Sequence, residues 1–169
     1  MSVGPRVVFT RFLSSESPKL RPWMAHRGRV IDVATVRAVP TVVMTPADEG
    51  GPAEPTDTVV VWQLVSANNR QLARSAHIHT SFEAATTSAR SIVESAVPLT
   101  VGLISEQGRG VYGWFASIDE APVMICARWY ATERDRRHSI QLALASIATA
   151  ALHAGARLVD PALMRDSAR

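Results

Sequence analysis

A run of apolar residues just after residue 57 predicts a β-strand, and the pattern that follows predicts a hairpin and then a helix. The strand is expected over Val59–Val65, the turn at Asn68–Asn69 and the returning strand over Gln71–Ser75. Thr80 and Glu83 then have the spacing of a capping box, which marks a helix start. The inner face of this helix is predicted to consist of Ala85, Ala89, Ile92, Val93 and Ala96.

The same order of signals appears a second time further along the chain. Val111–Ser117 and Val123–Ala127 predict two strands around a turn at Asp119–Glu120. Thr132 and Asp135 predict the next helix start, with Asp in place of the preferred Glu or Gln. The apolar stripe of this helix is predicted to be Ile140, Leu144, Ile147, Ala148 and Ala151.

These two stretches form a tandem repeat with a shift of 52 residues, over 58–107 and 108–160. Each helix is followed by a short strand candidate, Leu99–Ile104 in the first unit and Arg157–Val159 in the second, where Gly155 is predicted to end the helix. The matched pairs at this shift are Trp62 with Trp114, Ile78 with Tyr130 and Thr80 with Thr132.

The chain before the repeat divides into a basic arm, which we expect to pack on the main domain or on a partner, and an acidic linker. Residues 1–44 have a local net charge of +5 and short β-type runs at Val7–Phe9, Val30–Val33 and Val39–Met44. Residues 45–57 hold three prolines, two glycines and four acids, which is typical of a flexible linker. We therefore expect a fragment that starts near residue 56 to fold alone, with 161–169 as a C-terminal tail after a helical turn at Asp160–Pro161.

Composition and charge restrict the class of protein without assigning a function. Of the 169 residues, 47% are apolar and 20% are charged, as in an ordinary globular protein. Cys126 is the only cysteine, and no apolar run approaches the ~20 residues that cross a bilayer. We therefore expect a cytoplasmic protein with no membrane partner. All but one of the 18 basic residues are arginine, but a net charge of +3 is too small to indicate a nucleic-acid binder by itself.

Two short motifs match the residue pattern of a ligand site but not its structural context. Gly108–Gly113 matches G-x-G-x-x-G, but a phosphate loop must open a helix, whereas this one leads into a predicted strand. A glycine-rich hairpin turn is the better interpretation. His77 and His79 can point the same way on an extended chain, yet a zinc site needs three or four ligands. We expect no metal site.

Nucleophilic and paired-carboxylate chemistry are not indicated either. Cys126 lies in the middle of an apolar strand, where a buried thiol is common. Glu83 and Asp135 are explained as helix-capping acids. Three serines lack the G-x-S-x-G context of a hydrolase, namely Ser75, Ser117 and Ser139. We assign no catalytic residue and no cofactor.

The segment from Arg128 to His138 is the best candidate for a partner-binding surface. Its arginines can neutralise phosphates, and its aromatic residues can stack on unpaired bases. Glu133 and Asp135 dilute the charge, so a solvated helix start remains the alternative interpretation. The candidate partner-binding residues are Arg128, Trp129, Tyr130, Arg134, Arg136 and Arg137.

Three stretches together resemble one known family: WQLVSANNRQLARS, HTSFEA and WFASIDEAPVMICARWYATERDR. Over about residues 58–160 the chain resembles the YegP-like family of small bacterial proteins, although Asp119–Pro122 replaces the usual Asn-containing turn. The resemblance implies two units that share one antiparallel sheet and exchange their final strands. It implies no catalytic residues.

Taken together, these features predict an α+β fold of two tandem β-β-(β)-α-β units sharing one antiparallel sheet, with helices on one face. We expect a monomer, because the two units complete each other's sheet edges. The expected function is a non-catalytic interaction module that binds a protein partner through the sheet face or the basic arm. The alternative is a nucleic-acid-associated protein that uses the arm and the segment 128–137, and an enzyme ranks third.

Overall fold

The computed structural model describes residues 4–37, 58–95 and 98–159, with side chains not described at 33–37. The linker 45–57, the tail 161–169, the strand expected at 39–44 and the helical turn expected at 160–161 lie outside these residues. The elements in chain order are β1 (Arg6–Phe12), α1 (Arg21–Arg37), β2 (Val59–Val65), β3 (Gln71–Ser75), α2 (Phe82–Val93), β4 (Thr100–Glu106), β5 (Val111–Ile118), β6 (Ala121–Cys126), α3 (Glu133–Ile147) and β7 (Ala151–Leu158).

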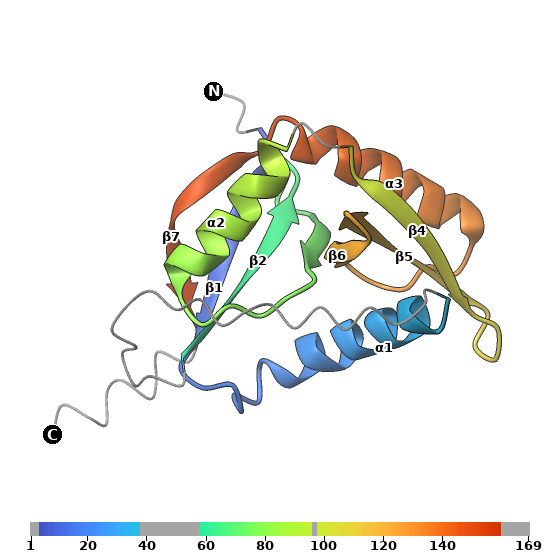
Figure 1. Cartoon of the computed structure of the whole chain (residues 1–169), viewed down its shortest axis with the longest axis horizontal. Coiled ribbons are helices and arrows are strands. Elements are labelled where there is room, and N and C mark those ends of the chain that lie inside the picture. The colour runs from blue at the N-terminus through green and yellow to red at the C-terminus, as the bar shows by residue number, and fades with distance from the viewer. Residues whose placement is uncertain (1–3, 38–57, 96–97, 160–169) are drawn as a thin grey trace, which may run out of the picture.

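The strands form a single sheet, which confirms the predicted α+β class (Figure 1). Their order is β4-β5-β6-β3-β2-β1-β7, with β3 and β6 as the central antiparallel pair. Every neighbouring pair is antiparallel except β1 and β7, which are parallel. The sheet is therefore mixed rather than purely antiparallel as expected.

The final strand of the first unit crosses to the second unit. β4 pairs with β5 along its whole length, from Thr100 opposite Ser117 to Glu106 opposite Val111. At the other side of the sheet, β7 does not pair with β2, because β1 lies between them. The final strand of the first unit, β4, thus pairs directly with the second unit. The final strand of the second unit, β7, is separated from the first unit by β1.

The described part of the N-terminal segment packs on the main domain, and it goes further than the expected arm because it contributes an interior strand and a helix to the fold. Val7 and Phe9 of β1 are 0% and 1% exposed because their side chains pack into the main core, and β1 has a hydrogen-bonded strand on each side. The predicted strand over Val30–Val33 is instead part of α1. Val30 is fully buried, and this tertiary packing outweighs the β preference of a short apolar run.

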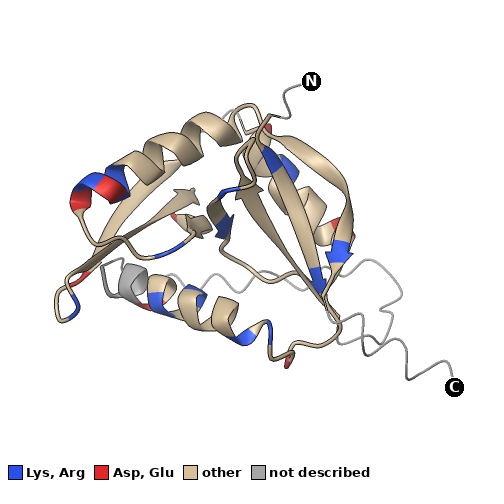
Figure 2. Ribbon diagram, turned by 180° about the vertical axis from the view of Figure 1, so that it is seen from behind, with Lys and Arg blue, Asp and Glu red and all other residues tan. Residues whose placement is uncertain are grey.

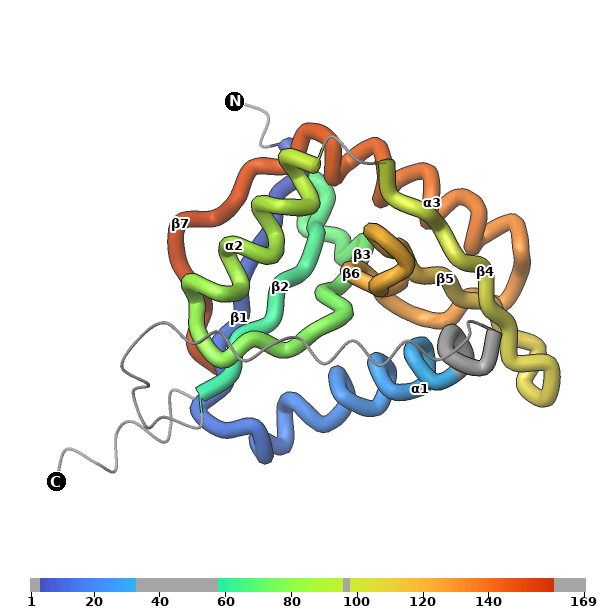
Figure 3. Tube along the Cα trace, in the orientation of Figure 1, coloured from blue at the N-terminus to red at the C-terminus, as the bar shows by residue number. Residues whose placement is uncertain are grey.

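The helices cover both faces of the sheet, not one face as expected (Figures 1 and 3). Successive residues of β2 point to opposite sides. Val60 and Trp62 belong to the large core that includes residues of α2 and α3, whereas Val61 packs with Leu20 and Trp23 at the start of α1. Helix α1 thus covers the face opposite to α2 and α3.

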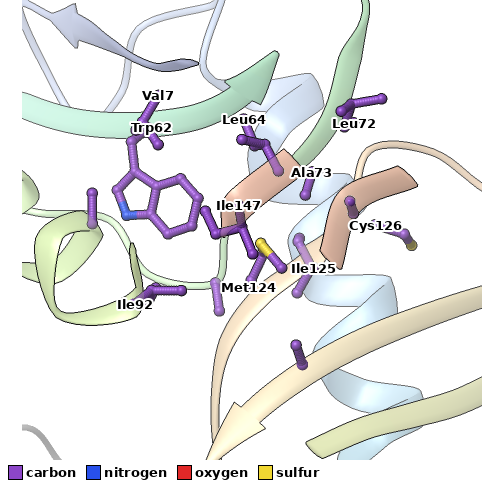
Figure 4. Close-up of a cluster of buried hydrophobic side chains, with 14 of the residues drawn as sticks. Val7, Trp62, Leu64, Leu72, Ala73, Ile92, Met124, Ile125, Cys126 and Ile147 are labelled. Carbon is purple, nitrogen blue, oxygen red and sulfur yellow. The ribbon is translucent and has the colours of Figure 1, made fainter. Parts of the chain in front are cut away.

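The main core lies around Trp62 (Figure 4). Ile92 of α2 and Ile147 of α3 approach its indole together with Met124 of β6. Trp114 is likewise fully buried in β5, at the position that the repeat assigns to the equivalent of Trp62. The two tryptophans therefore occupy corresponding strands of the two hairpins.

Basic residues of α1 hold the helix against the sheet. Arg29 makes a two-pronged ion pair with Glu106 of β4, with its Nε 3.0 Å and its Nη2 2.9 Å from the two carboxylate oxygens. This contact lowers the pKa of Glu106 from its ordinary value. His26 Nε2 donates to the Cys126 carbonyl at 2.7 Å, and Arg27 donates to the Ala76 carbonyl. Much of the positive charge of this segment is thus used within the fold.

The register of the repeat changes from 52 to 51 residues after the first hairpin strand. Two isolated bridges make this visible, Val60 with His79 and Tyr112 with Tyr130. Val60 and Tyr112 are 52 residues apart, whereas His79 and Tyr130 are 51 apart. Tyr130 therefore corresponds to His79 and not to Ile78.

The same change of register moves the first helix cap. Ser81, not Thr80, is the N-cap of α2, and its hydroxyl accepts from the Ala84 N–H at 3.0 Å. Thr132 caps α3 as predicted, by accepting from the Asp135 N–H at 3.1 Å. The expected Thr80 cap was wrong because the helix begins one residue later than the spacing of Thr80 and Glu83 suggests.

We expect Ser81→Ala to lower the free energy of unfolding by about 1 kcal/mol, because the Ala84 N–H loses its acceptor. Thr80→Ala is the matched control, since Thr80 is exposed and outside the cap, and it should change stability by less than about 0.5 kcal/mol. Urea denaturation of both variants measures the difference. Equal effects of the two substitutions would contradict the assignment of the cap.

The buried stripe of α3 differs from the prediction. The buried residues are Arg136, Ala143 and Ile147, and the helix ends at Ile147, before Ala151 and Gly155, which both lie in β7. Apolar residues occupy several sides of this helix, so periodicity alone does not select the buried side. In α2, by contrast, Ala85, Ala89 and Ile92 of the predicted face are buried and Val93 is half-buried, while Ala96 lies outside the described residues.

Candidate binding site at the start of helix α3

The six predicted partner-binding residues separate into two groups in space. Arg128, Arg134 and Arg137 are exposed around the start of α3, and Tyr130 lies beneath them, 7% exposed. Trp129 and Arg136 point into other parts of the fold. The candidate segment therefore contributes a smaller surface than its sequence suggests.

Trp129 packs between β5 and α1. A Cβ atom at Gly113 would lie 2.9 Å from the Trp129 ring, so the strand approaches the indole closely at this glycine. The Arg29 guanidinium stands 4.9 Å from the centroid of the same ring, and the His26 ring is 6.4 Å away. Trp129 thus helps to dock α1, and the Arg29 guanidinium occupies one face of its ring.

Arg136 is a structural residue of α3. It is 9% exposed, and its Nη1 donates to the Ile104 carbonyl of β4 at 3.1 Å. Its guanidinium also stands 5.3 Å from the centroid of the Tyr112 ring and 3.8 Å from the Glu133 carboxylate. These contacts hold α3 against β4 and β5, the two strands at one edge of the sheet.

A pocket of about 340 Å³ lies where the pairing of the two central strands ends. The last pair at this end is Ala73 with Cys126, and the residues beyond it on both strands line the pocket together with α3. We call it the β3–α3 pocket. Its lining residues are Arg70, Gln71, Leu72, Arg74, Ala127, Arg128, Tyr130, Asp135, His138, Ser139 and Leu142.

A hydrogen-bonded chain of three side chains lies at this pocket. The Trp114 Nε1–H donates to the Ser139 hydroxyl at 3.0 Å, and the Ser139 and Tyr130 hydroxyls are 2.6 Å apart. Burial raises the pKa of Tyr130, so the phenol stays protonated near neutral pH. The buried Trp114 indole thereby fixes the position of the Ser139 hydroxyl, which in turn fixes that of the Tyr130 hydroxyl.

A second hollow, of about 600 Å³, adjoins the pocket at Asp135 and His138. Its remaining lining residues include Arg134 and Arg137. Figure 2 shows basic and acidic residues side by side at the start of α3. We call the exposed arginines Arg70, Arg128, Arg134 and Arg137 the α3 basic surface.

The arginines of the α3 basic surface have no carboxylate partner within the described residues, although the Arg128 guanidinium stands 5.4 Å from the centroid of the Tyr130 ring. Within residues 4–37, 58–95 and 98–159, no carboxylate forms an ion pair with any of its four arginines. This contrasts with Arg29, Arg109 and Arg136, each of which pairs with a glutamate. Such unpaired guanidiniums are suited to carboxylate or phosphate groups of a partner.

The other candidate residues have structural contacts. Cys126 is buried, and desolvation raises the pKa of its thiol to about 11, so little thiolate exists near neutral pH. Burial lowers the pKa of His77, and that of His79 to about 4, with the neighbouring His77 contributing. The described part of the chain holds no group of three or more metal-ligating side chains.

The glycine motif and the remaining serines also have structural roles. Gly108 and Gly110 lie in the turn that joins β4 to β5, as predicted, and the φ of 61° at Gly110 suits glycine. The Ser75 hydroxyl accepts from the Trp62 N–H at 3.3 Å, and that of Ser117 donates to the Thr100 carbonyl at the same distance. Neither arrangement activates a nucleophile.

Comparison with known proteins adds nothing to this geometry. No family model, no curated protein and no solved structure matches the chain. In addition, none of the helices in the described residues is long and apolar enough to cross a membrane.

Sequence reasoning missed two arginines of the site and misjudged one serine. Arg70 and Arg74 come from the first repeat and meet Arg128 only because β3 pairs with β6. Ser139 was considered only as a possible nucleophile. The repeat could have indicated Arg70 and Arg74, because two similar units that share a sheet can place their second hairpin strands, here β3 and β6, side by side.

Proposed function

We propose that this protein is a non-catalytic interaction module that binds an acidic segment of a protein partner through the α3 basic surface. The observation that carries this proposal is the set of four exposed arginines without an ion pair within the described residues, around two adjoining hollows. Arginine forms two parallel hydrogen bonds with a carboxylate, so an acidic segment matches this surface in charge and geometry.

Two surfaces considered from the sequence are less suited to this role. Both faces of the sheet carry helices, and strand β1 and the basic residues of α1 make internal contacts. The α3 basic surface is the part of the expected binding region that remains open. We therefore assign partner binding to the end of the neighbouring strands β3 and β6, where their pairing stops.

A nucleic-acid partner is the second candidate, supported by the same arginines. Single-stranded nucleic acids are usually held by base stacking in addition to phosphate contacts. The two aromatic residues of the segment are engaged in the fold, Trp129 against α1 and Tyr130 at Ser139. The protein partner is therefore the better match.

We also propose that the protein acts as a monomer in the cytoplasm and that it is related to the YegP-like family. The tandem repeat supports the monomer, because β4 of one unit completes the sheet of the other within a single chain. Sedimentation velocity tests this proposal, and a concentration-dependent dimer would contradict it.

The function is tested by fluorescence anisotropy with a labelled peptide rich in Asp and Glu. We expect the double variant Arg134→Gln/Arg137→Gln to weaken binding by about tenfold, because two charge-assisted contacts are lost. Arg90→Gln/Arg157→Gln is the control with the same change in charge, at exposed arginines elsewhere on the fold, and it should bind like the wild type.

The alternative is measured in parallel with a single-stranded oligonucleotide of matched net charge. Tighter binding of the oligonucleotide, with a steep dependence of affinity on salt concentration, would establish nucleic acid as the partner in place of protein. Equal losses in the surface variant and in the control variant would show that net charge alone is responsible, which would overturn the proposed surface.

A further inference from the structure

The β3–α3 pocket has an excess of positive charge and of hydrogen-bond donors. Arg70, Arg74 and Arg128 line it, and each guanidinium carries five N–H groups and accepts no hydrogen bond. Asp135 is the single carboxylate among its described lining residues. With His138 neutral, these charged side chains sum to +2, which a ligand with two negative charges would neutralise.

The hydroxyl pair in the pocket adds one more donor. The Tyr130 and Ser139 hydroxyls together hold two protons, and only one of these protons can lie in the 2.6 Å contact between them. The Trp114 N–H already donates to the Ser139 oxygen. Whichever hydroxyl donates to the other, a second proton is left for an acceptor atom at the pocket.

Arg74 has a donor that nothing in the described residues accepts. Its Nε is buried without a hydrogen-bond partner, and burial lowers the pKa of its guanidinium. The guanidinium stands 4.8 Å from the centroid of the Trp23 ring, which holds the side chain in place. This contact holds the Arg74 guanidinium on the α1 face of the sheet, so Arg74 adds positive charge near the pocket while Arg70 and Arg128 supply its guanidinium donors.

We propose that the β3–α3 pocket binds a phosphomonoester group carried by the acidic partner segment, an inference that rests on the function proposed above. A phosphomonoester carries a charge of about −1.5 to −2 at pH 7 and offers three strong acceptor oxygens. A carboxylate has half that charge and two oxygens. The guanidiniums of Arg70 and Arg128, the nearby charge of Arg74 and one spare hydroxyl proton therefore match the phosphoryl group better.

Isothermal titration calorimetry with three acidic peptides tests this inference. The peptides are identical except at one central position, which is phosphoserine, serine or glutamate. We expect the full-length protein to bind the phosphoserine peptide about tenfold more tightly than the glutamate peptide. The advantage should shrink between pH 7.5 and pH 5, because the second proton of the phosphate binds with a pKa of about 6.

Variants of pocket residues test whether the preference for the phosphoserine peptide arises in the β3–α3 pocket. Arg70→Gln and Arg128→Gln should each reduce the preference for phosphoserine by about fivefold, and Tyr130→Phe should reduce it by a smaller factor. Arg157→Gln, an exposed arginine on β7, is the matched control and should leave the preference unchanged. Thermal denaturation of each variant confirms that it is folded.

Three other results would contradict the phosphate site, the partner segment or both proposals. Equal binding of the three peptides, still weakened by Arg134→Gln/Arg137→Gln, would retain the acidic-partner function and overturn the phosphate site. Binding of inorganic phosphate alone as tightly as the phosphoserine peptide would indicate a free phosphorylated small molecule and overturn the partner segment. Absence of binding to all probes would overturn both proposals.

Discussion

Removing residues 1–57 will abolish cooperative folding, although the sequence alone suggested that the remaining repeat would fold by itself. Strand β1 is interior to the sheet, with Val7 and Phe9 almost fully buried, and α1 buries Trp23 and Val30. Each such side chain contributes about 1.5–3 kcal/mol, and a domain is stable by only about 5–15 kcal/mol in total. The loss of this segment exceeds what the repeat can tolerate.

Circular dichroism during thermal unfolding measures this effect on the fragment 58–169. We expect a broad transition of low amplitude in place of a sharp one. Adding residues 1–37 as a separate peptide is the positive control, because it supplies β1 and α1 again and should restore part of the transition. A sharp transition of the fragment alone would mean that β7 can pair directly with β2, and that the N-terminal strand is dispensable.

Replacing Trp62 by alanine will lower the free energy of unfolding by about 3–5 kcal/mol. The indole is fully buried at the centre of the main core, between residues of α2 and α3, so its removal leaves a cavity that several elements line. Denaturant unfolding followed by circular dichroism gives the value. Met24→Ala is the control, since Met24 is 39% exposed, and it should cost less than about 1 kcal/mol.

Substitution by phenylalanine is expected to have different effects on stability at the two tryptophans of the repeat. Trp62 Nε1 has no hydrogen-bond partner among the described residues, whereas Trp114 Nε1 donates to Ser139. We therefore expect Trp114→Phe to cost about 1 kcal/mol more than Trp62→Phe, because it also removes a buried hydrogen bond. Equal costs would show that the bond to Ser139 adds no stability.

The local elements of the repeat were predictable because their signals lie within a few residues. The strand Val59–Val65 has the predicted bounds, and both hairpin turns form where they were expected. Asn69, Asp119 and Glu120 adopt positive φ angles of 65°, 49° and 68°, which turn residues such as Asn and Asp tolerate. These features depend on backbone preference and short-range pairing alone.

The candidate site was only half predictable. Arg128, Arg134 and Arg137 were identified from one basic segment, but Arg70 and Arg74 join them through the pairing of β3 with β6, which links distant parts of the chain. Arg136 and Trp129 make internal contacts through the packing of α3 on β4 and of α1 on β5, which the basic segment alone does not indicate.

The sequence by itself determined the two repeats, their hairpins and the Thr132 cap, because alternation of apolar residues and local hydrogen bonding require only neighbouring residues. The tertiary structure decided the place of β1 between β2 and β7, the helical state of Val30 and the second covered face of the sheet. These depend on which apolar surfaces meet after the chain has collapsed, and sequence order does not specify those partners.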